Sequence, residues 1–186
     1  GAQYAAADNM TQQFAALSAL VRTGIGEEAL EAFRAQWQGD RLVMDKWFNI
    51  QPLLAARDRA AAVTAVLAED ADFDWRNPNR FRALLGGLAG NAAGFHAADG
   101  AGYALMADWL IRLDPVNPQT TARMSTVFET WRRYDAGRQQ DGAEDLERGA
   151  GHLARLLHHA EAREGRQQAA LHEDRQGDQQ VEEVEG

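Results

Sequence analysis

The sequence predicts an all-α fold of antiparallel helical hairpins that stack as a bundle or a superhelix. Three observations lead to this prediction. Four prolines in 186 residues leave long stretches free to be helical. Alanine is the dominant residue, and the alternating β-branched runs that indicate strands are missing. Apolar residues also recur at helical spacing in successive segments joined by short connections, which is typical of antiparallel neighbours.

Seven helices are predicted, each from its apolar spacing or its alanine content. In chain order, they cover about residues 11–23, 27–38, 40–54, 58–67, 80–88, 100–113 and 117–137. The fourth is an alanine-rich run, and the others carry apolar residues three and four positions apart. Their apolar faces include Phe14, Leu17 and Leu20; Leu30, Phe33 and Trp37; Val43, Trp47 and Ile50; Phe81, Leu84 and Leu88; Tyr103, Met106 and Leu110; and Met124, Val127, Phe128, Trp131 and Tyr134.

Residues that begin and end helices set the predicted boundaries. Acceptor side chains suited to an N-cap stand at Thr11, Asp40, Asp58 and Asn79. Asn117 followed by Pro118 is a stronger start signal, because proline fits the first helical position. Glycines at 24, 26, 39 and 90 are placed to end the helices that precede them.

The charge and the aromatic residues divide the chain near residue 140. Residues 1–140 carry 14 basic and 16 acidic side chains, whereas residues 141–186 carry 5 and 12. All five tryptophans, seven phenylalanines and three tyrosines precede residue 140. We therefore expect a helical domain over 1–140 and an acidic tail over 141–186. The tail has one possible helix at about 145–170 and is otherwise expected to be disordered.

Composition excludes several classes of function. The chain has no cysteine, so disulfides and thiolate chemistry are excluded. The expected location is the cytoplasm, which the absence of cysteine allows but does not require. The net charge of −9 argues against nucleic acid and anionic membranes as partners. No apolar run is long enough to span a bilayer. The first residue is glycine rather than methionine, which suggests a fragment.

No common catalytic or nucleotide-binding motif is present. The sequence lacks H-E-x-x-H, G-x-S-x-G, the phosphate-binding G-x-x-x-x-G-K and the dinucleotide fingerprint. Histidines at 152, 158, 159 and 172 suggest a metal, but His152 and His159 would lie two helical turns apart, too far for one ion. We therefore expect no catalytic residue and no metal ligand in this chain.

The segment from Phe95 to Tyr103 predicts a tight turn before a helix. Asp99 can cap that helix, and Gly100 allows the turn. His96 could act as a base or a ligand, although a histidine in a turn more often holds backbone carbonyls together.

Arginines gather around the turn Asn77-Pro78-Asn79, and Arg123 follows one turn into the last large helix. The gathered side chains are Arg76, Arg80 and Arg82. Arginine can hold a carboxylate through two hydrogen bonds, so these residues could bind an anionic group. The alternative is surface charge, or internal ion pairs with Asp72, Asp74 or Asp114.

Four strings in register resemble the C-terminal helical domain of bacterial aminopeptidase N, a zinc metallopeptidase of the gluzincin type. They are Ala7 to Thr11, Leu42 to Phe48, Asn77 to Arg82, and Phe95 to Tyr103. Asn117-Pro118-Gln119 with Arg123, and Arg132-Arg133-Tyr134-Asp135, continue the match, which covers about residues 3–139. The tail departs from the family's ending, so it is either a divergent extension or the product of a shifted reading frame.

The resemblance implies a non-catalytic role. In this family the helical domain closes over a catalytic domain of the same polypeptide and walls a cavity that admits peptides. Zinc there is held by two histidines and a glutamate, none of which has a counterpart in this chain. The positions matching cavity arginines are Arg82 and Arg123, and the implied role is electrostatic guidance of the peptide. The competing hypothesis is an autonomous helical scaffold that binds a protein partner without enzymatic activity.

Overall fold

The computed structural model describes residues 4, 7 and 9–130, and within them the chain is all-helical. In chain order the elements are α2 (Met10–Arg22), α3 (Glu27–Trp37), α4 (Arg41–Leu54), α5 (Ala60–Ala68), α6 (Pro78–Gly90), α7 (Ala92–Phe95), α8 (Ala101–Leu113), α9 (Pro118–Ser125) and the 3₁₀ helix η1 (Thr126–Thr130). The predicted all-α class is confirmed.

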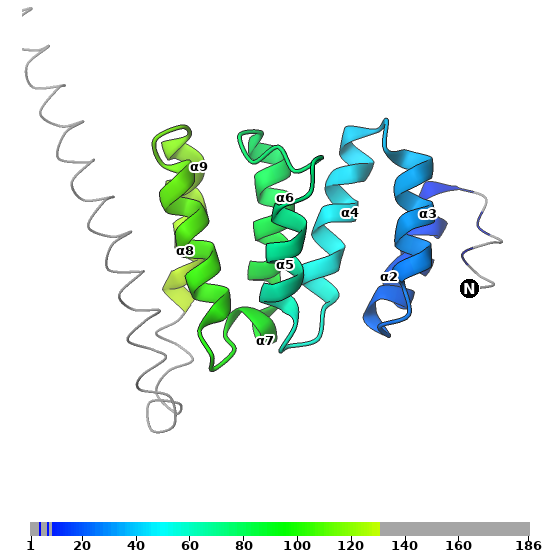
Figure 1. Ribbon diagram of the computed structural model, residues 1–186, viewed down its shortest axis with the longest axis horizontal. Coiled ribbons are helices and arrows are strands. Elements are labelled where there is room, and N and C mark those ends of the chain that lie inside the picture. The colour runs from blue at the N-terminus through cyan, green and yellow to red at the C-terminus, as the bar shows by residue number, and fades with distance from the viewer. Residues whose placement is uncertain (1–3, 5–6, 8, 131–186) are drawn as a thin grey trace, which may run out of the picture.

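Successive antiparallel helices form two layers (Figure 1). Helices α2, α4, α6 and α9 pack one against the next in one layer, with the α4–α6 contact the most extensive. In Figure 1, α5 and α8 lie in front of α6 and α9, and with α3 they form the second layer. This is a row of stacked hairpins, as the apolar patterning predicts.

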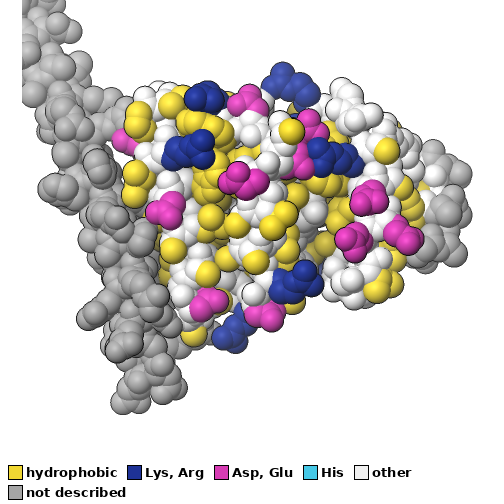
Figure 2. All heavy atoms as spheres, in the orientation of Figure 1, with side chains coloured by type: hydrophobic (Ala, Val, Ile, Leu, Met, Phe, Trp, Pro, Cys, Tyr) yellow, Lys and Arg dark blue, Asp and Glu magenta, His cyan; other side chains and the backbone are white. Residues whose placement is uncertain are grey.

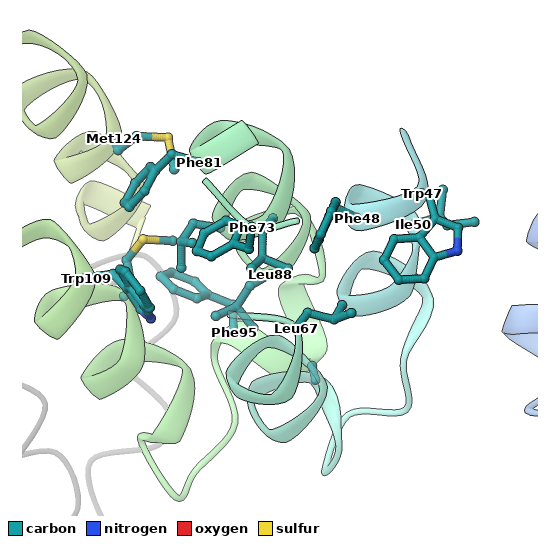
Figure 3. Close-up of a cluster of buried hydrophobic side chains, with 14 of the residues drawn as sticks. Trp47, Phe48, Ile50, Leu67, Phe73, Phe81, Leu88, Phe95, Trp109 and Met124 are labelled. Atoms are coloured by element: carbon teal, nitrogen blue, oxygen red, sulfur yellow. The ribbon is translucent and has the colours of Figure 1, made fainter. Parts of the chain in front are cut away.

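Large apolar side chains from both layers meet in one continuous core (Figure 3). Phe48 of α4, Phe81 of α6 and Leu110 of α8 are fully buried. The ring of Phe73, from the α5–α6 connection, contacts Phe48 at 5.9 Å and Trp109 at 5.5 Å between centroids. The core therefore joins the hairpins into one body.

Three predicted helix starts are wrong by one or two residues. Asn9, not Thr11, caps α2, because its side chain accepts from the Gln12 N–H at 3.0 Å. Asn77, not Asn79, caps α6, since it directly precedes the proline at the first helical position. Helix α5 begins at Ala60 after Arg59, with no side-chain cap from Asp58.

The helix predicted over 117–137 changes form before it reaches residue 130. The α-helix ends at Ser125, and a 3₁₀ helix follows. The hydroxyls of Ser125 and Thr126 donate to the carbonyls of Ala122 and Arg123, which draws the last turn away from regular α-helical pairing. The short helix α7 was not predicted, because four residues show no periodicity. Residues 131–137 and the predicted tail lie outside the described residues.

Candidate functional site

The first turn of α6 holds Arg82 in a defined orientation. Its Nε donates to the Pro78 carbonyl at 3.1 Å, and its Nη2 donates to Asn79 Oδ1 at 2.5 Å. The side chain is exposed, and among the described residues it makes no ion pair. The guanidinium is thus held by neutral acceptors and keeps its charge available to an incoming anion.

Arg123 lies on the neighbouring helix of the same layer. It is in the last turn of α9, is exposed, and has no carboxylate partner in the described part of the chain. Since α6 packs against α9, the fold brings the helices that carry Arg82 and Arg123 together from positions 41 residues apart. The structure thus places both arginines, exposed, on neighbouring helices of one layer.

Arg80, two residues before Arg82 in the expected cluster, has a structural role instead. Its Nε donates to Asp45 Oδ1 at 2.6 Å, and its Nη1 donates to the Asp72 carbonyl at 3.1 Å. The Arg80 side chain is only 9% exposed, and its guanidinium carbon lies 4.7 Å from the centre of the Phe48 ring. The internal ion-pair interpretation therefore holds for Arg80, but the carboxylate is Asp45 on α4, not one of the three that the sequence suggested.

Arg34 forms a second internal ion pair that the sequence did not predict. It donates to both carboxylate oxygens of Asp70, at 2.6 and 2.8 Å, and to Asp72 at 2.5 Å. Burial alone raises the pKa of Asp70. The hydrogen bonds from Arg34 and from the Asp72 backbone N–H, with the charge of Arg34, more than offset this and lower the pKa below its ordinary value of 3.8. The pair ties α3 to the end of α5.

The turn before α8 is built around glycines and a histidine–tyrosine pair. Asp99 Oδ1 accepts from the Ala101 N–H at 3.1 Å, and Gly100 has a φ of 67°. A Cβ at Gly102 would lie 2.7 Å from the Phe95 carbonyl oxygen, so the chain approaches itself too closely for any other residue. His96 Nδ1 makes a hydrogen bond with the Tyr103 hydroxyl, a side-chain partner where the sequence suggested backbone carbonyls.

A groove of about 590 Å³ lies between α3 and α5 and is lined by charges of both signs, including Glu27, Glu31 and Arg59. On the face seen in Figure 2, where α5 and α8 lie in front, basic and acidic side chains are interspersed with hydrophobic ones.

A second groove, of about 490 Å³, lies on the layer that carries Arg82. Phe14, Ile50, Leu53 and Ala83 line it, with Lys46 among its charged residues. Lys46 lies in the string Leu42 to Phe48, but the sequence indicated no function for it. The groove forms because α2 and α6 both pack against α4.

The described residues include no group of three or more histidine, aspartate or glutamate side chains that could hold a metal ion. The histidines at 152, 158, 159 and 172 lie outside them. In the described part of the chain, no helix is both long and apolar enough to cross a membrane.

Residues 1–155 match the sequence family described as "Domain of unknown function (DUF3458_C) ARM repeats". The chain belongs to this family. It is 42% identical over 137 residues to aminopeptidase N of Caulobacter vibrioides, 39% over 150 residues to that of Haemophilus influenzae, and 38% over 141 residues to that of Escherichia coli. These alignments cover 70%, 78% and 74% of this chain.

A solved structure also resembles the chain. It is Legionella pneumophila aminopeptidase A in complex with aspartic acid, with a TM-score of 0.72 and 30% sequence identity over 87% of this chain. The alignment covers 20% of that chain, and 15–17% of the length of the three aminopeptidase N relatives. The resemblance to the aminopeptidase N helical domain is thus confirmed, and the chain is homologous to one part of a larger aminopeptidase.

Proposed function

We propose that this chain is the non-catalytic C-terminal portion of a zinc-dependent aminopeptidase that removes N-terminal residues from peptides. The observation that carries the proposal is the 42% identity to aminopeptidase N over 70% of this chain but only 15% of that relative. The chain walls the substrate cavity and restricts access to it. Its partners are then the catalytic domain of the same polypeptide and peptide substrates, in the cytoplasm.

Zinc belongs to the catalytic domain in this proposal. The ion would activate water and polarise the scissile carbonyl there. The sequence has no H-E-x-x-H, and the described residues bring no three metal ligands together. What this chain contributes is binding: Arg82 and Arg123 attract and orient the C-terminal side of the peptide.

Substrates that differ only at their C-terminus test this role. In the full-length protein, Arg82→Gln with Arg123→Gln is expected to lower kcat/KM for a tripeptide with a free carboxylate by about 10- to 100-fold, the range for lost hydrogen bonds to a charged group. The same tripeptide amide should be cleaved at an unchanged rate. Arg59→Gln, on the other layer, is the matched control. Equal losses on acid and amide would refute guidance of the carboxylate.

The 186-residue chain by itself provides a second test. We expect no stoichiometric zinc and no cleavage of an alanyl chromogenic amide, and clear turnover would show that the domain is misassigned. The coding sequence upstream distinguishes this proposal from an autonomous scaffold. The proposal requires an H-E-x-x-H there, with a glutamate about two dozen residues further on.

A further inference from the structure

Two arginines and two tryptophans form a stacked cluster where the α5–α6 connection meets α8. Trp75 and Arg76 lie in the connection, and Trp109 and Arg112 lie on α8. The two indole centroids are 6.3 Å apart. The guanidinium carbon of Arg112 lies 4.7 Å from the Trp75 ring centre and 4.8 Å from that of Trp109. That of Arg76 lies 4.4 Å from the Trp75 ring centre, so one indole contacts both cations.

The hydrophobic core fixes one side of this cluster. Trp109 is only 7% exposed, and its ring centre lies 5.5 Å from that of Phe73 and 6.4 Å from that of Phe81 (Figure 3). A guanidinium that stacks on an indole uses its faces, so the N–H groups at its edge stay available as donors. The rings therefore orient the guanidiniums of Arg76 and Arg112 without consuming their hydrogen bonds.

The two guanidiniums are close together, and no described carboxylate neutralises them. Both side chains are exposed, and neither forms an ion pair with a described residue. Their distances to the Trp75 ring centre, 4.4 and 4.7 Å, mean that the guanidinium carbons of Arg76 and Arg112 are at most about 9 Å apart. Asp74 contributes to the turn instead, since its Oδ1 accepts from the Arg76 backbone N–H at 3.1 Å. Figure 2 shows basic side chains beside hydrophobic ones at the end of α8 that leads to α9.

We propose that Arg76 and Arg112 bind a dianionic phosphate group, either free phosphate or the phosphate of a small monoester. A phosphorus atom hydrogen-bonded to a guanidinium lies about 4 Å from the guanidinium carbon, so one phosphate can contact both arginines. Its three or four terminal oxygens serve two guanidiniums, whereas one arginine in a bidentate pair uses both oxygens of a carboxylate. Its two negative charges also match the two cations.

This site differs from the surface assigned to peptide guidance. Arg112 lies on α8 in the second layer, whereas Arg82 and Arg123 lie on α6 and α9 in the first. The phosphate site therefore does not rest on the proposed function.

The test is a titration of the ¹⁵N-labelled 186-residue chain, in a phosphate-free buffer of low ionic strength, since salt screens exposed charges. Phenyl phosphate is expected to shift the Nε–H signals of Arg76 and Arg112 and to saturate in the millimolar range, which is typical of a ligand this small. Phenyl sulfate has the same shape and one negative charge fewer, and benzoate has only two oxygens. Both should bind at least about fivefold more weakly. Inorganic phosphate distinguishes the two sources: tighter binding of phenyl phosphate indicates a monoester, and equal or tighter binding of inorganic phosphate indicates the free ion.

Three variants separate the charges from the aromatic support. Arg76→Gln and Arg112→Gln, which also assign the two signals, should each weaken phenyl phosphate binding about three- to tenfold, the range for an exposed charge-assisted contact. Trp75→Leu keeps both charges but removes the stacking surface, and should weaken binding about threefold. Arg57→Gln is the matched control, because Arg57 is exposed and makes no ion pair with a described residue, and it should bind normally. Circular dichroism of each variant verifies that the helices are retained.

Equal binding of phenyl phosphate and phenyl sulfate, or phenyl phosphate binding that survives Arg76→Gln with Arg112→Gln, would overturn the proposal, as would the absence of saturable binding. The full-length protein covers the case in which the chain needs the rest of the polypeptide to fold. There, phenyl phosphate should raise the melting temperature of the native protein but not that of the double variant. Since neither readout measures hydrolysis, failure here leaves the test of Arg82 and Arg123 intact, and the reverse also holds.

Discussion

Adding a single methyl group at Gly87 tests the close contact between α4 and α6. A Cβ at this position would lie 2.4 Å from the Asn49 carbonyl oxygen and 2.9 Å from Pro52 Cγ, both on α4. The obstacle is backbone and a rigid ring, so α4 and α6 would have to move apart. Overpacking of this kind costs about 1–3 kcal/mol, and the better helix propensity of alanine returns about 1 kcal/mol.

The adjacent glycine is the matched control. A Cβ at Gly86 would meet nothing within 4 Å, so Gly86→Ala keeps only the propensity gain and should stabilise the chain by about 0.5–1 kcal/mol. Gly87→Ala should destabilise it by up to about 2 kcal/mol. At about 3 °C per kcal/mol for a chain of this size, the melting temperature of Gly87→Ala should lie about 2–9 °C below that of Gly86→Ala.

Urea titration followed by circular dichroism at 222 nm measures the free energies of unfolding of both variants. If Gly87→Ala is as stable as Gly86→Ala, the backbones of α4 and α6 are not in contact at this point. The reasoning from the Asn49 carbonyl would then be wrong.

Three further predictions concern the ion pairs and the turn before α8. Because the pKa of Asp70 is lowered in the folded state, its carboxylate stabilises the fold fully above about pH 4, and this contribution is lost as the pH falls through the folded pKa, below 3.8. In an acid titration below pH 4, the free energy of unfolding of Asp70→Asn should therefore fall less steeply than that of the native chain. Asp45→Asn leaves the buried Arg80 without its carboxylate and should lower the free energy of unfolding in urea by about 3 kcal/mol. Asp58 is exposed and forms no ion pair with a described residue, so the control Asp58→Asn should change it by less than about 0.5 kcal/mol. Gly100→Ala places a Cβ on a residue with a φ of 67° and should lower stability by about 1 kcal/mol; a thermal melt unchanged from the native chain would contradict this.

Much of the local structure could be predicted because its causes lie within a few residues of each other. The apolar spacing of α4 and the start at Asn117-Pro118 both appear in the structure as expected. The errors were local too: Thr11 and Asn79 are sound N-cap residues, but Asn9 and Asn77 stand two positions earlier and take that role. For α6 the deciding signal was in the sequence, since Pro78 fits the first helical position directly after Asn77.

The arginines show most clearly what could be predicted about the candidate site. Their number and spacing suggested anion binding or internal pairing, and nothing local separates Arg80 from Arg82. In the structure Arg80 points into the domain toward Asp45, whereas Arg82 stays exposed on the first turn of its own helix.

The sequence by itself determined the all-helical class, the apolar face of most helices and the family, because each depends on residue order alone. Only the tertiary structure decided which charges are used within the fold. Arg34 pairs with Asp70 across 36 residues, and Asp45 pairs with Arg80 across 35. Such partners meet only when helices have packed, since the apolar core and not the charges sets which faces approach. Arg82 and Arg123, to which we assign peptide guidance, form no ion pair with a described residue.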